Sequence, residues 1–312
     1  MENVIEISGL CKSFKDIKAV QNLSFSVERG SLFAFLGVNG AGKSTTISMM
    51  CGQLTPDSGR IFIDGNDIVN APDAVKSSIG VVFQGSALDK PLSVFDNLKC
   101  RAALYGICGD AFEKRAAELT ELLDMSDILK RPYGKLSGGQ KRKADIARAL
   151  LHKPRILILD EPTTGLDPQT RRMVWEVIDS LRRTESMTVF LTTHYMEEAA
   201  DADKVIILDG GRIVAEGTPV ELKNKYTADY ITLYGKSEEE VAAIGIPYER
   251  VADGYQLKLQ STAEATRLIE SAPELFTDYE IVKGKMDDVF IAATGKSLNT
   301  DENTGKKGGK RK

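Results

Sequence analysis

A glycine-containing loop between an apolar run and a helix-like run most constrains the fold of this chain. Residues 37–45 read Gly-Val-Asn-Gly-Ala-Gly-Lys-Ser-Thr and match the spacing Gly-x4-Gly-Lys-Ser. Residues 31–36 have the composition of a buried strand, and residues 43–50 have helical character. In this setting backbone N–H groups wrap a polyphosphate and the lysine reaches its terminal groups. The context argues against the plainer interpretation, a glycine turn before a helix.

The loop predicts a set of contacts. The Ser44 hydroxyl is placed to hold Mg²⁺. We expect phosphate groups to be held by Gly37, Asn39, Gly40, Ala41, Gly42, Lys43, Ser44 and Thr45.

A second segment, Leu-Ser-Gly-Gly-Gln at residues 136–140, follows further along the chain. Residues 140–152 are strongly helical in composition, so Ser137, Gly138 and Gly139 come at a helix N-terminus, with Gln140 next to them. Exposed N–H groups and the positive end of the helix dipole make such a corner an anion site. A flexible Ser-Gly linker is the alternative, since a Gly-Gly pair usually marks a loop.

A third segment is the apolar run at residues 156–159, which is followed directly by two carboxylates, Asp160 and Glu161. With these segments in this order, residues 1–225 resemble the ATP-binding subunits of ABC transporters. The resemblance implies that Asp160 helps to hold Mg²⁺, usually through water, and that Glu161 polarises the water that attacks ATP. The alternative is a strand that happens to end in a solvated acidic pair, which the phosphate loop disfavours.

Three shorter matches follow in the same order. Gln84 resembles the glutamine that contacts Mg²⁺ and the attacking water at the place where the membrane partner docks. Residues 165–168 resemble the loop that crosses to the opposite subunit, and His194 resembles the histidine that touches the γ-phosphate. Taken alone, a polar residue at a strand end or a Gly-x-Asp-Pro turn usually has only a structural role.

Two further positions bear on nucleotide binding. Phe14 stands where the family carries an aromatic residue that stacks on adenine, and an ordinary half-buried Phe is the alternative. Val38 stands where proline is commoner in the family, which alters the stiffness of the loop but removes no ligand. His152 ends a helix, where the dipole favours histidine, and we interpret it as structural.

The resemblance implies phosphoryl transfer from ATP to water, a reaction that depends on positioning and charge neutralisation. Lys43, Mg²⁺ and backbone donors handle the charge, while Glu161 and His194 order the water and the γ-phosphate. In the family the Ser-Gly-Gly corner reaches the phosphate bound by the other subunit. We therefore expect a second cassette, as in a homodimer, and two ATP molecules sandwiched head to tail.

Composition limits the partners of the chain. A net charge of −4 and a pI near 5.5 do not suggest a general nucleic-acid binder, which is usually basic. The four cysteines show no Cys-x-x-Cys spacing and predict free, mostly buried thiols in a reduced setting. No signal pattern and no apolar run long enough to span a bilayer occurs. We expect a cytoplasmic protein, peripheral on the inner face of the cell membrane through an integral-membrane permease subunit.

The order of segments predicts an α/β fold, and the resemblance implies that of a P-loop NTPase of the ABC cassette type. Strand-like segments at residues 4–10, 23–28 and 60–64 predict an antiparallel β subdomain, and residues 89–150 predict an inserted helical subdomain. Strands and helices then alternate from residue 156, which predicts a mostly parallel sheet.

The remaining residues predict a second domain and a tail. Residues 226–295 have the order β-α-β-β-α-β, consistent with a small C-terminal ferredoxin-like α+β domain. Residues 296–312 end in lysines among glycines and predict a disordered basic tail.

Two functions remain open from the sequence. Residues 83–94 and 191–199 resemble exporters of the daunorubicin and multidrug-resistance type. This resemblance implies an ATPase that drives a drug-like or lipid-like substrate through a separate permease. The alternative is a soluble ABC ATPase acting on ribosomes or DNA, whose members usually have two fused cassettes or long coiled-coil insertions. One cassette and no sustained heptads favour the exporter.

Overall fold

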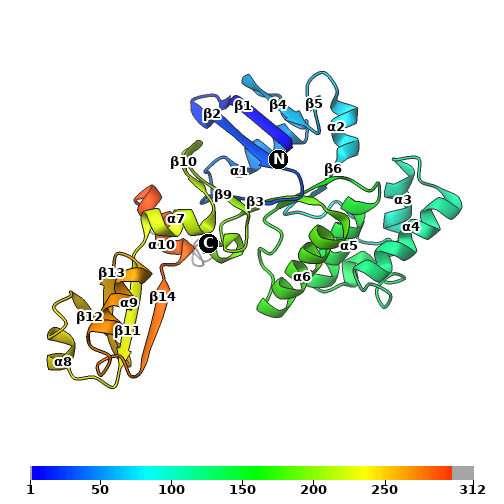
Figure 1. The fold of residues 1–312 in the computed structure, drawn as a ribbon. Helices are drawn as coiled ribbons and strands as arrows, with labels where there is room; N and C mark the ends of the chain where they lie inside the picture. The colour runs from blue at the N-terminus through cyan, green and yellow to red at the C-terminus, as the bar shows by residue number, and fades with distance from the viewer. Residues whose placement is uncertain (1, 297–312) are drawn as a thin grey trace, which may run out of the picture. The chain divides into compact units, whose positions relative to one another are not determined.

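The computed structural model describes residues 2–296. The chain divides into two compact units, Met1–Pro219 and Val220–Lys312, which are described separately (Figure 1). The sequence placed the change between residues 225 and 226, at the end of helix α7 (Pro219–Tyr226).

A six-stranded sheet forms the centre of the first unit, in the order β10-β9-β3-β8-β7-β6. Its strands are β3 (Leu32–Leu36), β6 (Ile79–Val82), β7 (Ile156–Asp160), β8 (Thr188–Thr193), β9 (Lys204–Asp209) and β10 (Arg212–Gly217). The pairs from β9 to β6 are parallel, as predicted, and β10 pairs with β9 in antiparallel fashion. Every residue of β3, β7 and β8 is buried, which explains the nearly continuous apolar sequences of β3 and β7. The carboxyl ends of β3, β6, β7 and β8 therefore bring four loops to one edge of the sheet.

A second, antiparallel sheet in the order β2-β1-β4-β5 packs on the first. Its strands are β1 (Asn3–Phe14), β2 (Ile17–Glu28), β4 (Ser58–Ile63) and β5 (Asn66–Asp67). Buried residues of the two sheets form one hydrophobic core. The ring of Phe25 lies 5.4 Å from that of Phe33 and 6.2 Å from that of Phe190, so aromatic stacking joins β2 to the central strands.

Helices flank the central sheet of the first unit. They are α1 (Lys43–Met50), α2 (Pro72–Ser78), α6 (Pro168–Glu185) and the 3-10 helix η2 (Met196–Ala199). Asp167 caps α6 by accepting a hydrogen bond from the backbone N–H of Thr170, and Pro168 fits the first helical position.

The inserted helical subdomain is present as predicted. It consists of α3 (Val94–Ala103), α4 (Gly109–Leu122), the 3-10 helix η1 (Tyr133–Lys135) and α5 (Gly138–Leu150). One face of α5 holds the end of β6 and the loop after it. A guanidinium N–H of Arg142 donates to Phe83 O at 3.0 Å, and the carboxylate of Asp145 accepts from Ser86 Oγ at 2.6 Å.

The second unit is a four-stranded antiparallel sheet in the order β12-β13-β11-β14. Its strands are β11 (Asp229–Tyr234), β12 (Tyr248–Val251), β13 (Gly254–Leu259) and β14 (Tyr279–Lys283), and its helices besides α7 are α8 (Glu238–Ala242), α9 (Thr262–Ser271) and α10 (Met286–Thr294). The element order from β11 to β14 is the expected β-α-β-β-α-β order. Ile231, Leu257, Val241 and Ala265 share a core separate from that of the first unit. The predicted tail, apart from Lys296, lies outside the described residues.

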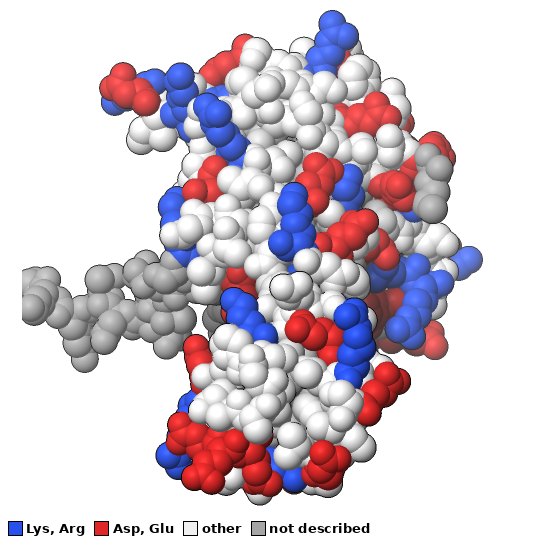
Figure 2. All heavy atoms as spheres, turned by 60° about the vertical axis from the view of Figure 1, so that its left-hand side comes forward, with Lys and Arg blue, Asp and Glu red and all other residues white. Residues whose placement is uncertain are grey.

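Residues 2–296 contain no helix that is long and apolar enough to cross a bilayer. Acidic and basic side chains are interspersed on the face shown in Figure 2. The four cysteines are free, as predicted. The expectation that most of them are buried is wrong: Cys51 is buried and Cys11 half-buried, whereas Cys100 and Cys108 are exposed in the helical subdomain.

Candidate nucleotide site

Glycines shape the loop between β3 and α1. Gly40 and Gly42 have φ angles of 84° and 106°, in the left-handed region that side chains with a Cβ rarely adopt. A Cβ at Gly42 would lie 2.5 Å from the backbone oxygen of Ala19, so only glycine fits there. Asn39, Gly40 and Ser44 are exposed. Such a loop offers backbone N–H groups at a helix N-terminus, which is the arrangement that binds phosphate.

Lys43 is held close to the loop by acceptors of the chain itself. Its ammonium donates to Gly37 O at 2.6 Å and lies 3.4 Å from Glu161 Oε1, with only 4% of the side chain exposed. Burial lowers the pKa of Lys43, and the Glu161 carboxylate opposes this change. The loop and the end of β7 are thereby joined by a buried ion pair.

The backbone at Glu161 is strained. Its φ of 47° is left-handed, which costs a non-glycine residue about 1–3 kcal/mol. The Glu161 N–H donates to Thr192 O at 3.0 Å, so a hydrogen bond to β8 supports this conformation. Strain of this kind persists where the surroundings determine the conformation, as they do at many functional sites.

Side chains from several segments meet at the Glu161 carboxylate. Gln84 Nε2 donates to Oε2 at 3.4 Å, and Thr164 Oγ1 donates to the same atom at 3.2 Å. His194 Nδ1 lies 3.4 Å from Oε2. The His194 ring, and after it the Lys43 ammonium, lowers the pKa of Glu161 to about 2 against the effect of burial. Glu161 is therefore an anion at neutral pH.

Asp160 lies beside this cluster with a different environment. Its Oδ1 accepts from Thr192 Oγ1 at 2.6 Å, and the residue is 7% exposed. Burial raises the pKa of Asp160, and the hydroxyls of Thr192 and Ser44 oppose the rise. Hydroxyl, amide and carboxylate oxygens are the donors that Mg²⁺ prefers. Within residues 2–296 no three His, Cys, Asp or Glu side chains cluster as a metal site, so a cation here would also need phosphate oxygens or water.

The Ser137–Gln140 corner lies apart from this cluster. Ser137 and Gln140 form a capping box, in which each side chain accepts from the other residue's backbone N–H. A Cβ at Gly139 would lie 2.6 Å from Thr170 Cγ2, so the corner packs tightly against α6. Among the described residues, no hydrogen bond or ion pair joins the corner to Lys43 or Glu161. Its role at a phosphate stays a prediction.

The structure adds residues that sequence reasoning missed and leaves one prediction as it was. Thr192 and Thr164 fix the two carboxylates, and a hydroxyl side chain two residues before His194 and two residues after Pro162 was the available signal. Phe14 is 46% exposed at the end of β1, with Lys12 Nζ 5.8 Å from its ring centre. An exposed ring suits stacking, and its contact with adenine remains a prediction.

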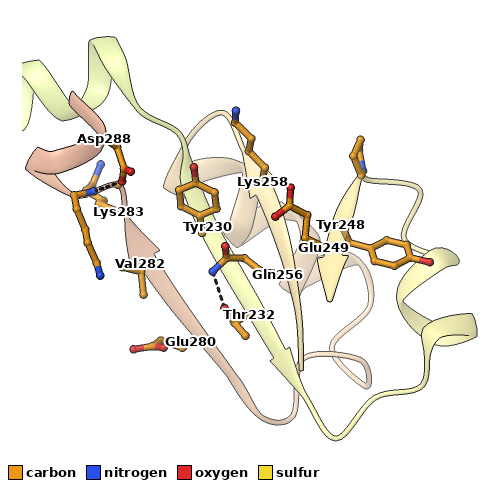
Figure 3. A pocket seen from close by; sticks show the side chains of 13 residues that line it. Tyr230, Thr232, Tyr248, Glu249, Gln256, Lys258, Glu280, Val282, Lys283 and Asp288 are labelled. Atoms are coloured by element: carbon orange, nitrogen blue, oxygen red, sulfur yellow. Dashed lines mark hydrogen bonds between the residues drawn. The ribbon is translucent and has the colours of Figure 1, made fainter. Parts of the chain in front are cut away.

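A separate cavity of about 660 Å³ lies on the open face of the C-terminal sheet (Figure 3). Tyr230 and Gln256 rise from neighbouring strands at its floor, and Gln256 Nε2 donates to Thr232 Oγ1 at 3.3 Å. Acidic and basic side chains both line it, including Glu280 and Lys258. This cavity contains none of the predicted nucleotide-binding residues.

Comparison with known proteins agrees with the site in the first unit. Residues 20–164 match the family model described as ABC transporter. The daunorubicin/doxorubicin resistance ATP-binding protein DrrA of Streptomyces peucetius is 35% identical over 305 residues, covering 93% of this chain and 92% of that protein. The Nod factor export ATP-binding protein I of Rhizobium sp. (strain N33) is 35% identical over 309 residues, covering 94% and 98%.

Solved structures show the same cassette. That of cbiO1 from Clostridium perfringens, part of the ABC transporter complex cbiONQ, is 29% identical with a TM-score of 0.66 and covers 71% of this chain and 91% of that chain. The dimeric post-hydrolysis structure of the cassette MJ0796 with ADP and Pi is 25% identical with a TM-score of 0.63, covering 69% and 98%. The predicted P-loop fold is thus confirmed, and this chain belongs to the ABC transporter family as an ATP-binding, ATP-hydrolysing cassette.

Proposed function

We propose that two copies of this chain hydrolyse ATP in the seam between them and thereby drive export of a drug-like or lipid-like substrate through a separate permease. The observation that carries this proposal is the convergence on one carboxylate. Lys43, Gln84 and His194 reach Glu161 from three separate segments of the first unit, and Thr164 reaches it from the loop that follows Glu161. ATP hydrolysis linked to transport is the activity of the family.

The geometry supports different roles for Lys43 and Glu161 in hydrolysis. The Lys43 ammonium and the loop N–H groups neutralise phosphate charge, which is the main requirement of phosphoryl transfer. A phosphate oxygen competes with Glu161 for Lys43, so nucleotide binding leaves the Glu161 carboxylate free to accept from another donor. Glu161 then accepts a hydrogen bond from the attacking water more strongly, with His194 and Gln84 beside it.

We assign a Mg²⁺ site to Ser44, Gln84 and Asp160. Asp160 is a buried carboxyl whose partners are hydroxyl groups, and a divalent cation would favour its ionised form. When bound, Mg²⁺ supplies neutralisation of charge on the ATP phosphates. The mixture of one carboxylate with neutral oxygen donors is typical of a site that magnesium shares with a nucleotide.

The second copy supplies the missing half of the site. The Ser137–Gln140 corner is a helix N-terminus with Ser137 and Gly138 exposed, so it can donate to an anion on another molecule. The dimeric cassette MJ0796 supports this arrangement. In the same proposal, Phe14 stacks on adenine and Gly37 to Thr45 hold the phosphates.

The membrane partner and the location follow from the relatives. Curated relatives over more than nine-tenths of this chain are drug-resistance and Nod factor export ATP-binding proteins. We infer that the chain works on the inner face of the cell membrane through a permease, with no nucleic-acid partner. The soluble alternative on ribosomes or DNA finds no support in these relatives.

Replacing Glu161 tests the hydrolysis proposal. The Glu161→Gln variant should bind ATP, lose about 10²- to 10⁴-fold in turnover and accumulate as a dimer with ATP, because the amide cannot take a proton. Phosphate release and size-exclusion chromatography measure these effects. Glu197→Gln, an exposed carboxylate, is the matched control. Turnover of Glu161→Gln equal to that of the control would discard the assignment.

Purification from membranes tests the exporter part. A tagged chain should bring down an integral-membrane protein whose presence raises ATP turnover. Recovery of ribosomal particles or DNA in its place would favour the soluble alternative.

A further inference from the structure

Glu198 is a buried carboxylate that the mechanism above does not use. It lies in η2, shortly after His194, and is 6% exposed. Its Oε1 accepts a hydrogen bond from Thr163 Oγ1, and the hydroxyl of Thr193 is a second polar neighbour of the carboxylate. Burial raises the pKa of Glu198, and these two hydroxyls oppose the rise. Burying a carboxyl group costs solvation free energy, which such hydrogen bonds offset in part.

The partner of Glu198 belongs to the loop that leaves the site. Thr163 is fully buried and stands between Glu161 and the predicted crossing loop, residues 165–168. Its neighbour Thr164 donates to Glu161 Oε2. Adjacent hydroxyls thus hold this segment, one at Glu161 and one at Glu198. The Thr163–Glu198 contact joins the segment after Glu161 to the segment after His194.

Arg171 brings a third segment to the same place. It lies in the first turn of α6, directly after the crossing loop, and its Nε is 4.0 Å from Glu198 Oε1. Its guanidinium lies 4.4 Å from the ring centre of Tyr195, which follows His194, and also pairs with Glu197 at 2.8 Å. The beginning and the end of the crossing loop are therefore both anchored near His194.

We propose that Glu198 is a positioning residue for ATP hydrolysis, which fixes the loop after Glu161 against the segment that carries His194. Glu198 acts through Thr163. It keeps Glu161 and His194, 3.4 Å apart, aimed at one phosphate while the crossing loop reaches the second copy. The inference rests on the proposed function, because only a hydrolytic site needs Glu161 and His194 held in a fixed relative position.

Steady-state kinetics on the full chain test this role. Glu198→Ala and Thr163→Val should each lower kcat about tenfold and change KM for ATP less than about twofold, since they displace groups that act on the reacting phosphate. The double variant should be no slower than either single variant, because both changes break one contact. Thr163→Ser and Glu198→Gln keep a donor and an acceptor, and should restore kcat to within about threefold of wild type.

Glu176 provides the control, since it is an exposed carboxylate of α6 that takes no part in the contacts described above. Glu176→Ala should leave kcat unchanged. If Glu198→Ala fails to fold, Thr163→Val, which is close in shape, carries the test alone. Equal kcat for Glu198→Ala and Glu176→Ala, additive losses in the double variant, or a KM that rises as far as kcat falls would each overturn the proposal. If Glu161→Gln is inactive, any of these results overturns only the role of Glu198. If Glu161→Gln is fully active, the proposed function itself fails.

Discussion

At the scale of single residues, Glu161 carries the most constraints. It combines a left-handed backbone with a buried carboxylate that faces Lys43 and His194. The strain and the ion pair oppose each other in their effect on stability. The side chain is therefore held in place by electrostatics rather than by backbone preference.

The lowered pKa of Glu161 makes the stability of the protein depend on pH. The pKa of Glu161 is lowered from 4.5 to about 2 on folding, so the carboxylate stabilises the fold above about pH 4.5, and this contribution is lost as pH falls through about 2. The full contribution is on the order of 3 kcal/mol. The difference in unfolding free energy between wild type and Glu161→Gln should shrink from about pH 6 to about pH 3. Urea denaturation measures it, and a difference that stays constant would contradict the assigned pKa.

At the scale of elements, α5 links two parts of the site. Its N-terminus is the Ser137–Gln140 corner, and its side chains Arg142 and Asp145 hold the loop that carries Gln84. The loop that carries Gln84 and the Ser137–Gln140 corner are therefore joined through one helix. Tyr133 completes the contact, because its hydroxyl donates to Asp145 Oδ2 at 3.1 Å.

Removing this contact should loosen the helical subdomain. Asp145→Ala leaves the hydroxyls of Ser86 and Tyr133 without their acceptor and should lower the unfolding free energy by about 1–3 kcal/mol. Lys143→Ala, on the same helix but bonded to Asp124, should change it by less than about 0.5 kcal/mol. Chemical denaturation of both variants measures the effect. Equal losses would mean that α5 is not attached through Asp145.

Sequence reasoning found the elements that are buried on all sides and misjudged those at the edges. The strands β3 and β7 are nearly continuous apolar runs and were predicted close to their observed bounds. In contrast, β1 extends to Phe14, beyond the predicted residue 10, because it keeps pairing with β2 across irregularities that no local pattern reveals. The edge strand β10 was not predicted, and it is only partly buried.

The site shows the same limit. The glycine spacing predicted the loop at residues 37–45, and the end of an apolar run predicted Asp160 and Glu161. Both are local patterns, which a single sequence shows. The contacts of Thr192 with Asp160 and of Thr163 with Glu198 join residues far apart in the sequence. Such contacts depend on how the strands align, so one sequence alone could not supply them.

At the scale of the whole molecule, each unit has its own core, and the predicted nucleotide-binding residues all lie in the first unit. Trp175, the single tryptophan, lies in α6 of that unit. Tryptophan fluorescence therefore follows the unfolding of the first unit.

Nucleotide should stabilise the two units unequally. ATP at about a hundred times its Kd should stabilise the first unit of the Glu161→Gln variant by about 2.7 kcal/mol, because only the folded site binds it. The denaturation midpoint seen by tryptophan fluorescence should rise accordingly. The midpoint without nucleotide is the reference, and a tryptophan transition that ATP does not move would place the binding site elsewhere.

The distribution of thiols has a practical consequence for following motion in this protein. Burial raises the pKa of Cys51, at the C-terminal end of α1, to about 12, so this thiol stays protonated and shielded from alkylating reagents. Cys100 and Cys108 stand open to reagents on the helical subdomain. Once the half-buried Cys11 is replaced, a maleimide dye will therefore mark the helical subdomain alone, at positions that the chain already carries.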